Sequence, residues 1–218
     1  KFWKCMNNLQ KRILTTLIVL PLSIFFVIKG GYFLSFFLIF ILFVGMYELF
    51  STFKKIKSIL FLSLILTLSL FSTYYLRESI IIGALLVYFA IAVSISSDIG
   101  GYVFGKVFKW KKLTKISPNK TISGVFGSYF CSFICLVVFN ELSHPVFVSD
   151  LTEIPEVLLT IIFSTIAQAG DLVISYLKRL EKIKDTGKIL PGHGGIFDRI
   201  DGLMFVVILA SFLHYFNI

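Results

Sequence analysis

The stretch 168–201 reads QAGDLVISYLKRLEKIKDTGKILPGHGGIFDRID, and it holds most of the chain's polar chemistry. Its first half is an apolar run that we expect to be helical, and in a helix residues three and four positions apart share a face. The polar side chains of this run fall on one such face: Gln168, Asp171, Ser175 and the pair Lys178-Arg179. A polar stripe on an apolar helix needs polar partners elsewhere in the chain.

The turn Gly192-His193-Gly194-Gly195 is expected to bind phosphate. Its glycines present backbone N–H groups without a Cβ, and a helix beginning near Phe197 would direct its positive end the same way. His193 lies between glycines in a polar loop, which favours phosphate contact or proton transfer over a buried structural role.

Two aspartates follow this turn. Asp198 and Asp201 are three positions apart, so they share a face of the expected helix and could hold one hard divalent cation through oxygen ligands. Carboxylates for a metal beside cations for phosphate indicate nucleotide chemistry.

The composition is that of a membrane protein. The chain of 218 residues is 57% hydrophobic and only 15% charged, whereas soluble domains carry about 25% charged residues. The net charge of +9 invites a nucleic-acid partner, but the basic residues follow apolar spans instead of covering a soluble domain. We therefore expect an all-α polytopic integral membrane protein with no nucleic-acid partner. The three cysteines have no metal-ligand or disulfide spacing.

About seven apolar runs approach the length needed to cross a hydrocarbon core of roughly 30 Å. They cover residues 13–28, 32–47, 58–76, 80–97, 123–140, 157–177 and 202–216. Every lysine and arginine except Lys29 and Arg77 lies on alternate connections between these runs. By the positive-inside rule the N-terminus is cytoplasmic, and the two long basic loops face the cytoplasm, where nucleoside triphosphates are found.

Asp171 is the residue for which a functional role is most strongly indicated. Attraction to anionic lipid headgroups explains the lysines of 178–188, but it does not explain a carboxylate inside an apolar span. A functional role is favoured over a structural pairing with a lysine. Glu48, at the end of the second span, is interpreted as an interfacial residue beside Tyr47.

The first long basic loop, 98–124, carries a second polar motif. Asp98 ends the fourth span, and Gly100, Gly101 and Gly105 offer a small-residue face for which helix packing is favoured over ligand binding. The loop closes with two hydroxyls, an amide and a cation: Ser117-Pro118-Asn119-Lys120-Thr121. A helix entry with capping side chains and a ligand-binding segment both remain open for this motif.

The motifs together resemble one enzyme family. The pattern runs Ser175-x-Leu177-Lys178-Arg179, then four residues, then Lys184-Asp185-x-Gly187-x-x-Leu190-Pro191-x-His193-Gly194-Gly195-Ile196-x-Asp198-Arg199-Ile200-Asp201. It is similar to the signature of the phosphatidate cytidylyltransferases, also called CDP-diacylglycerol synthases. Gln168-x-Gly170-Asp171, Asp98 with Tyr102 and Gly105, the 117–121 motif, and Asn8-Leu9 with Arg12 resemble further family patterns.

The resemblance implies transfer of CMP from CTP to phosphatidic acid, with Mg²⁺ and a second, monovalent cation such as K⁺ as cofactors. It assigns metal binding to Asp171, Asp198 and Asp201. Phosphates of nucleotide and lipid would be clamped by Lys178, Arg179, Lys184 and Arg199, while Asp185 and His193 orient groups or move a proton. Substrate-binding positions would be Asp98, Ser117, Pro118, Lys120, Thr121, Ser175, Gly194 and Gly195.

It also implies one integral membrane domain over 1–218, a homodimer, and a place in a bacterial-type inner membrane with the active site facing the cytoplasm. Two departures stand out: Ser123 replaces a frequent carboxylate, so no acidic role is expected there, and Gly202 replaces a commoner serine. The resemblance further implies one or two spans preceding Lys1.

Two other functions fit parts of the pattern. A CTP-dependent kinase of polyprenol-type lipids would use similar groups but release CDP instead of pyrophosphate. An ion-coupled transporter would use Asp171 as its coupling site. The clustering of polar residues on one side and the lack of a visible inverted repeat argue against the transporter.

Overall fold

The computed structural model describes residues 8–79, 81–114, 117, 120–187, 189, 194–216 and 218, with the side chains of 8–16 and 20 excepted. The described part is built from helices: α1 Asn8–Lys29, α2 Gly31–Thr52, α3 Ile56–Glu78, α4 Ile81–Phe108, α5 Ile122–Ser143, the short 3-10 helix η2 Val148–Asp150, α6 Glu156–Leu180 and α7 Phe197–Phe216. The described residues include one isolated antiparallel bridge between Lys112 and Thr121. The expectation of an all-α protein is confirmed.

Six of the helices, α2 to α7, are long and apolar enough to cross a membrane. Within the described residues, α1 contributes a shorter apolar segment, Leu17–Lys29. A polytopic membrane protein is therefore confirmed, while the count of seven spans and the cytoplasmic N-terminus stay predictions. One predicted boundary is wrong, because α4 continues to Phe108 and places Asp98 inside the helix instead of at its end.

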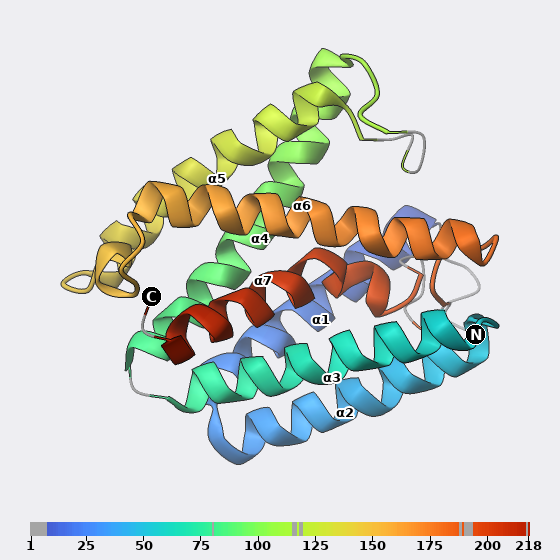
Figure 1. Ribbon diagram of the computed structural model, residues 1–218, viewed down its shortest axis with the longest axis horizontal. Helices are drawn as coiled ribbons and strands as arrows, with labels where there is room; N and C mark the ends of the chain where they lie inside the picture. The colour runs from blue at the N-terminus through green and yellow to red at the C-terminus, as the bar shows by residue number, and fades with distance from the viewer. Residues whose placement is uncertain are drawn as a thin grey trace.

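The helices pack around two groups of buried apolar side chains. One joins α3, α4, α5, α6 and α7, and includes Phe89 and Phe163. The other joins α2, α3, α6 and α7, and includes Leu66, Ile174 and Phe197. Helices α3, α6 and α7 contribute to both groups, and α6 and α7 cross the middle of the molecule (Figure 1). Their relative position is therefore set by packing on all sides.

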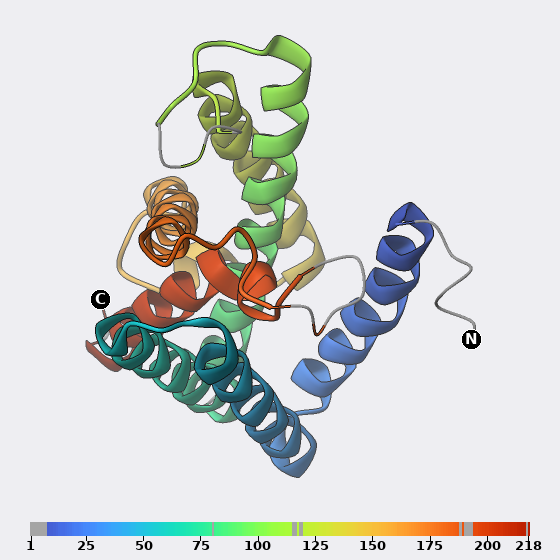
Figure 2. The ribbon, with the colours of Figure 1, turned by 90° about the vertical axis from the view of Figure 1, so that its right-hand side faces the viewer.

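Glycines let α4 and α5 lie very close together, and these two helices form an arm beside α6 (Figure 2). A Cβ on Gly100 would collide with the backbone of Gly127, and a Cβ on Gly101 would lie 2.9 Å from Ser128 Oγ. The helix-packing role predicted for this small-residue face is confirmed. Close packing also explains why α4 runs past Asp98, since its glycines lie against a partner helix instead of facing solvent.

The chain segments that carry the motifs lie at one end of the bundle. Figure 1 shows the connection between α2 and α3, the end of α6 and the start of α7 on the same side. Glu181, just beyond α6, connects the end of α6 to α3 and the residues before it, because it accepts hydrogen bonds from Ser58 Oγ at 2.8 Å and from the N–H groups of Lys54 and Lys55 at 3.2 Å. Desolvation raises the pKa of Glu181, but these hydrogen bonds outweigh it and hold the pKa below its ordinary value.

Candidate active site

Two distant motifs meet through an ion pair. Lys120 Nζ, in the segment before α5, lies 2.7 Å from Asp171 Oδ2 in the middle of α6, and it donates to the carbonyl of Gln168 at 3.2 Å. Both side chains of the pair are about three-quarters buried. From the sequence, a functional role for Asp171 was favoured over a structural pairing with a lysine. The structure shows that such a pairing exists. Its surroundings indicate that it also belongs to a ligand site.

A polar cavity of about 300 Å³ surrounds this ion pair. It is lined by Ser97, Asp98, Gly101, Tyr102, Ser117, Lys120, Thr121, Gly124, Val125, Ser128, Gln168 and Asp171. Four of the predicted substrate-binding residues thus line one space beside Asp171. Thr121 has two roles. It lines the cavity, and its side chain accepts a hydrogen bond from the Gly124 N–H at 3.1 Å as the N-cap of α5. The capping and ligand-binding interpretations of this motif are therefore compatible.

Three carboxylates from three helices lie near one another, and two of them, Asp98 and Asp171, line the cavity. Asp201 of α7 lies close enough to Asp171 of α6 for their charges to interact, and Asp98 of α4 interacts electrostatically with both. The opposing positive charges come from Lys120, Lys178 and Arg199. Two carboxylates this close repel each other unless a proton or a cation lies between them.

The predicted metal ligands fall into two groups. Asp201 turns toward Asp171, whereas Asp198 Oδ1 accepts from Lys178 Nζ at 2.8 Å and Asp198 Oδ2 accepts from the N–H groups of Thr186 and Gly195 at 2.9 and 3.0 Å. Within the described residues, no group of three or more histidine, cysteine or acidic side chains has the arrangement of a metal site. Metal binding by these three aspartates stays a prediction.

The remaining predicted residues are placed around this centre. Arg179 is exposed and donates to the carbonyl of Ile183 at 3.3 Å, and Lys184 and Asp185 are exposed in the loop that follows α6. Ser175 is half-buried one turn beyond Asp171. Gly194 adopts a φ of 90°, a conformation that favours glycine. His193 and Pro118 lie outside the described residues.

Glu48 is the polar residue that sequence reasoning misinterpreted. It is 0% exposed, and its carboxylate accepts hydrogen bonds from Thr186 Oγ1 and from the N–H groups of Ile196 at 2.7 Å and Phe197 at 3.3 Å. Its interpretation as an interfacial residue is wrong, because it points into the protein. The signal that identified Asp171, an acid within an apolar span, also applied to Glu48.

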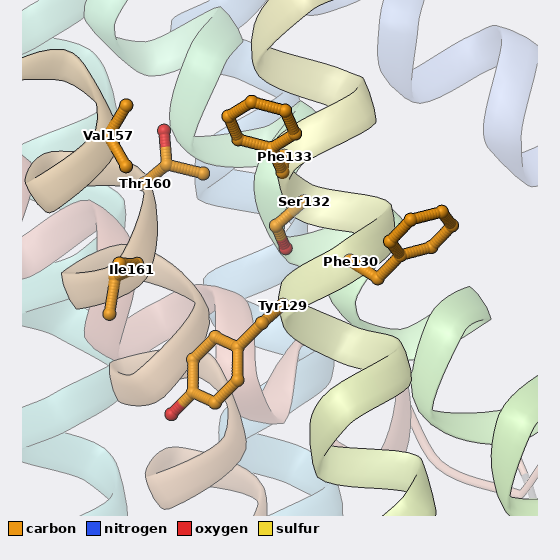
Figure 3. Close-up of a pocket in the computed structure, with 7 residues that line it drawn as sticks. All are labelled: Tyr129, Phe130, Ser132, Phe133, Val157, Thr160 and Ile161. Carbon is orange, nitrogen blue, oxygen red and sulfur yellow. The ribbon is translucent and has the colours of Figure 1, made fainter.

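A second cavity, of about 280 Å³ and almost wholly apolar, lies between α5 and α6 (Figure 3). It is lined by Tyr129, Phe130, Ser132, Phe133, Val157, Thr160 and Ile161. Along α5 it begins where the lining of the polar cavity ends, next to a hydrogen bond of 3.0 Å between Tyr129 and Thr165. Ser132 Oγ is buried and has no hydrogen-bond partner in the described part of the chain.

Comparison with known proteins identifies the family. Residues 51–216 match the model of the cytidylyltransferase family. The phosphatidate cytidylyltransferase of Staphylococcus epidermidis is 43% identical over 141 residues, which are 64% of this chain and 52% of that protein. The protein of the same name from Staphylococcus saprophyticus is 40% identical over 143 residues, with 64% and 52% covered.

The phosphatidate cytidylyltransferase of Staphylococcus aureus is 44% identical over 121 residues, which are 54% of this chain and 44% of that protein. The chain thus spans about half the length of the curated relatives it matches. The matched family segment contains α3 to α7, the polar cavity and the carboxylates around it, so it covers the whole centre described above. The chain belongs to the cytidylyltransferase family.

Proposed function

We propose that this protein transfers CMP from CTP to phosphatidic acid, which yields CDP-diacylglycerol and pyrophosphate for phospholipid biosynthesis. The observation that carries the proposal is the polar cavity lined by Asp98, Lys120 and Asp171, next to which Asp201 and Lys178 interact with these carboxylates. The names of the relatives support the choice of substrates. The site would face the cytoplasm of a bacterial-type inner membrane, which is the side on which CTP is found.

In this reaction an oxygen of the lipid phosphate attacks the α-phosphorus of CTP. The new phosphorus–oxygen bond forms as the bond to the bridging oxygen breaks, and pyrophosphate carries away the electron pair. Both reactants are anions, so catalysis depends mainly on positioning and charge neutralisation. The phosphate nucleophile is already ionised at neutral pH, so no general base is required. Asp185 and His193 would orient groups or move a proton.

The carboxylates fit a hard cation. Asp171 and Asp201 bring oxygen ligands close together with like charges, and Asp198 lies on the same helix as Asp201. We propose that these aspartates hold Mg²⁺, with a second, monovalent cation such as K⁺ beside it. A bound Mg²⁺ would supply positive charge to the phosphate oxygens of CTP.

The cationic side chains lie beside these carboxylates. Lys120 enters the polar cavity from the α5 side, and Lys178 approaches from α6 while paired to Asp198. Arg199 lies close enough to influence Asp98. We propose that they clamp phosphates together with Arg179 and Lys184, with arginine offering two parallel hydrogen bonds to each phosphate. Asp98, Ser117, Thr121, Ser175, Gly194 and Gly195 would contact the nucleotide or the lipid headgroup.

The two cavities suit a substrate with two chemical halves. The polar cavity suits a phosphate headgroup or nucleotide, and the apolar cavity, which follows it along α5 and α6, suits an acyl chain. Helices α5 and α6 contribute to both cavities, and α4 and the segment before α5 complete the lining of the polar one. A lipid could therefore place its phosphate near Asp171 while its chain extends along the seam between α5 and α6.

The deciding experiment measures pyrophosphate release by the purified protein in detergent with added lipid. We expect release only when CTP, phosphatidic acid and Mg²⁺ are all present, with CDP-diacylglycerol as the second product. Release of CDP with a phosphorylated lipid alcohol would assign the protein to the kinases instead. Absence of turnover from protein shown to be folded would contradict the proposal. Light scattering of the same sample tests the homodimer.

A further inference from the structure

We propose that Glu48 is a positioning residue of this site, which sets the loop before α7 and thereby the place of Asp198 and Asp201. The proposal rests on the function proposed above. Glu48 lies in α2, ahead of the segment 51–216 that matches the family, and no catalytic role was expected for it from the sequence.

The carboxylate of Glu48 is saturated with donors from one short segment. Thr186 Oγ1 and the N–H groups of Ile196 and Phe197 all donate to it, and Ile196 is 148 positions away in the chain. Glu48, Thr186 and Phe197 are each 0% exposed. A buried carboxylate is costly unless its oxygens accept hydrogen bonds, so this contact persists only while the loop keeps its position.

The loop is shaped to receive this side chain. A Cβ on Gly187 would lie 2.9 Å from the Cδ of Glu48, and a Cβ on Gly195 would collide with both Glu48 and Thr186. Neither glycine has a left-handed φ in the structure, so conformational freedom does not explain them. Their lack of a side chain leaves space for Glu48.

The same segment is held from its other side by Asp198. Thr186 donates its side-chain hydroxyl to Glu48 and its N–H to Asp198, while Gly195 donates its N–H to Asp198. Thr186 and Gly195 therefore lie between two carboxylates, one from α2 and one from α7. This arrangement connects the position of Glu48 to that of Asp198 without direct contact between Glu48 and substrate.

Glu48 also acts where α7 begins. The N–H groups of Ile196 and Phe197 are among those that a helix start leaves without intrahelical acceptors, and Glu48 accepts both. N-caps are usually local in sequence, but this acceptor comes from another helix and so fixes where α7 starts relative to α2. Asp201 lies one turn further along α7 and meets Asp171. A rotation of the first turn would separate that pair.

The test uses Glu48→Gln, which keeps the size and one acceptor oxygen but places an NH₂ group against N–H or O–H donors. The matched control is Glu78→Gln, since Glu78 also accepts a backbone N–H from another helix, that of Gly31 at 2.7 Å, far from the loop. Hydrogen exchange of the 186–197 segment and steady-state kinetics are measured for both variants. We expect faster exchange and a kcat lowered about tenfold or more for Glu48→Gln, with the KM for CTP nearly unchanged. Glu78→Gln should change neither.

A second variant keeps the test decisive if Glu48→Gln does not fold. Thr186→Val retains the shape of Thr186 but removes its donor to Glu48, and should raise exchange and lower kcat in the same direction by a smaller factor. In the double variant the two effects should not add, because the residues share one contact. Unchanged exchange and kcat in Thr186→Val, or full additivity, would overturn the proposal.

The exchange measurement separates this proposal from the proposed function. A wild-type protein without pyrophosphate release, together with faster exchange in Glu48→Gln, would overturn the function and retain the positioning of the loop by Glu48. Pyrophosphate release by all variants at the wild-type rate would retain the function and overturn the role of Glu48.

Discussion

At the scale of single residues, the properties of the site depend on which charged side chains contact one another. Asp198 and Asp201 are three positions apart, yet one is bound by Lys178 and two backbone N–H groups while the other meets Asp171. The charge of Asp198 is therefore partly balanced by Lys178. Asp201, together with Asp171, concentrates negative charge that a cation or proton must balance.

This difference leads to a prediction for the Asp171–Asp201 pair. Asp201→Asn and Asp171→Asn each remove a charged oxygen ligand and should lower kcat by about 100-fold or more while the protein still inserts into the membrane. Radiometric conversion of labelled CTP to CDP-diacylglycerol measures the loss. Lys54→Ala is the control, because its exposed side chain lies outside the site and only its backbone N–H contacts Glu181.

Turnover of Asp201→Asn close to that of Lys54→Ala would contradict metal binding by Asp201. Tightly bound Mg²⁺ measured by mass spectrometry of the metal content gives a second readout. Its loss in both aspartate variants, without loss in the control, is the expected outcome.

At the scale of helices, α5 and α6 carry both halves of the proposed substrate. The first turns of α5 and the middle of α6 contribute to the polar cavity. The next turns of α5 and the first turns of α6 line the apolar one (Figure 3). Ser132 is buried in the apolar lining without a hydrogen-bond partner among the described residues. A buried hydroxyl without a partner weakens packing, so this position is not optimised for a sealed contact between the two helices.

Filling the apolar cavity should alter the choice of lipid. Ser132→Leu occupies the space proposed for an acyl chain and should lower kcat/KM for dioleoyl phosphatidic acid by about tenfold, with little change for the dihexanoyl lipid. Val138→Leu, on the exposed lipid-facing side of α5, is the control. Equal losses for both lipids would indicate a packing defect and would count against an acyl-chain site.

At the scale of the whole molecule, the motif loops share one end of the bundle (Figure 1). Charge decides which side of the membrane that end faces, because basic loops are retained in the cytoplasm. The loop between α4 and α5 and the segment after α6 are basic, whereas the connection between α5 and α6 carries Asp150 and Glu153.

Cysteine labelling tests this orientation. With the native cysteines replaced by serine, Lys112→Cys should react with a membrane-impermeant maleimide only after the cells are permeabilised. Glu153→Cys should react in intact spheroplasts. Both positions are exposed in the structure. The reverse pattern would place the site outside the cytoplasm and contradict the proposed access to CTP.

The sequence by itself determined the helices, the membrane class and most of the residues at the centre. The composition of an apolar run is enough to predict that it is buried in lipid or protein. The shared face of Gln168, Asp171 and Lys178 follows from helical geometry. The start of α7 at Phe197 was also predicted, because the glycine turn and the following pattern are local signals.

Only the tertiary structure decided which of these residues meet. The pairing of Lys120 with Asp171, the approach of Asp98 to Asp201 and the contact of Glu48 with Thr186 each join segments far apart in the chain. Such contacts depend on how helices pack and rotate against one another, and a local pattern holds no information on that rotation. The sequence therefore identified the chemistry of the site, and the packing of α2, α4, α6 and α7 decided its geometry.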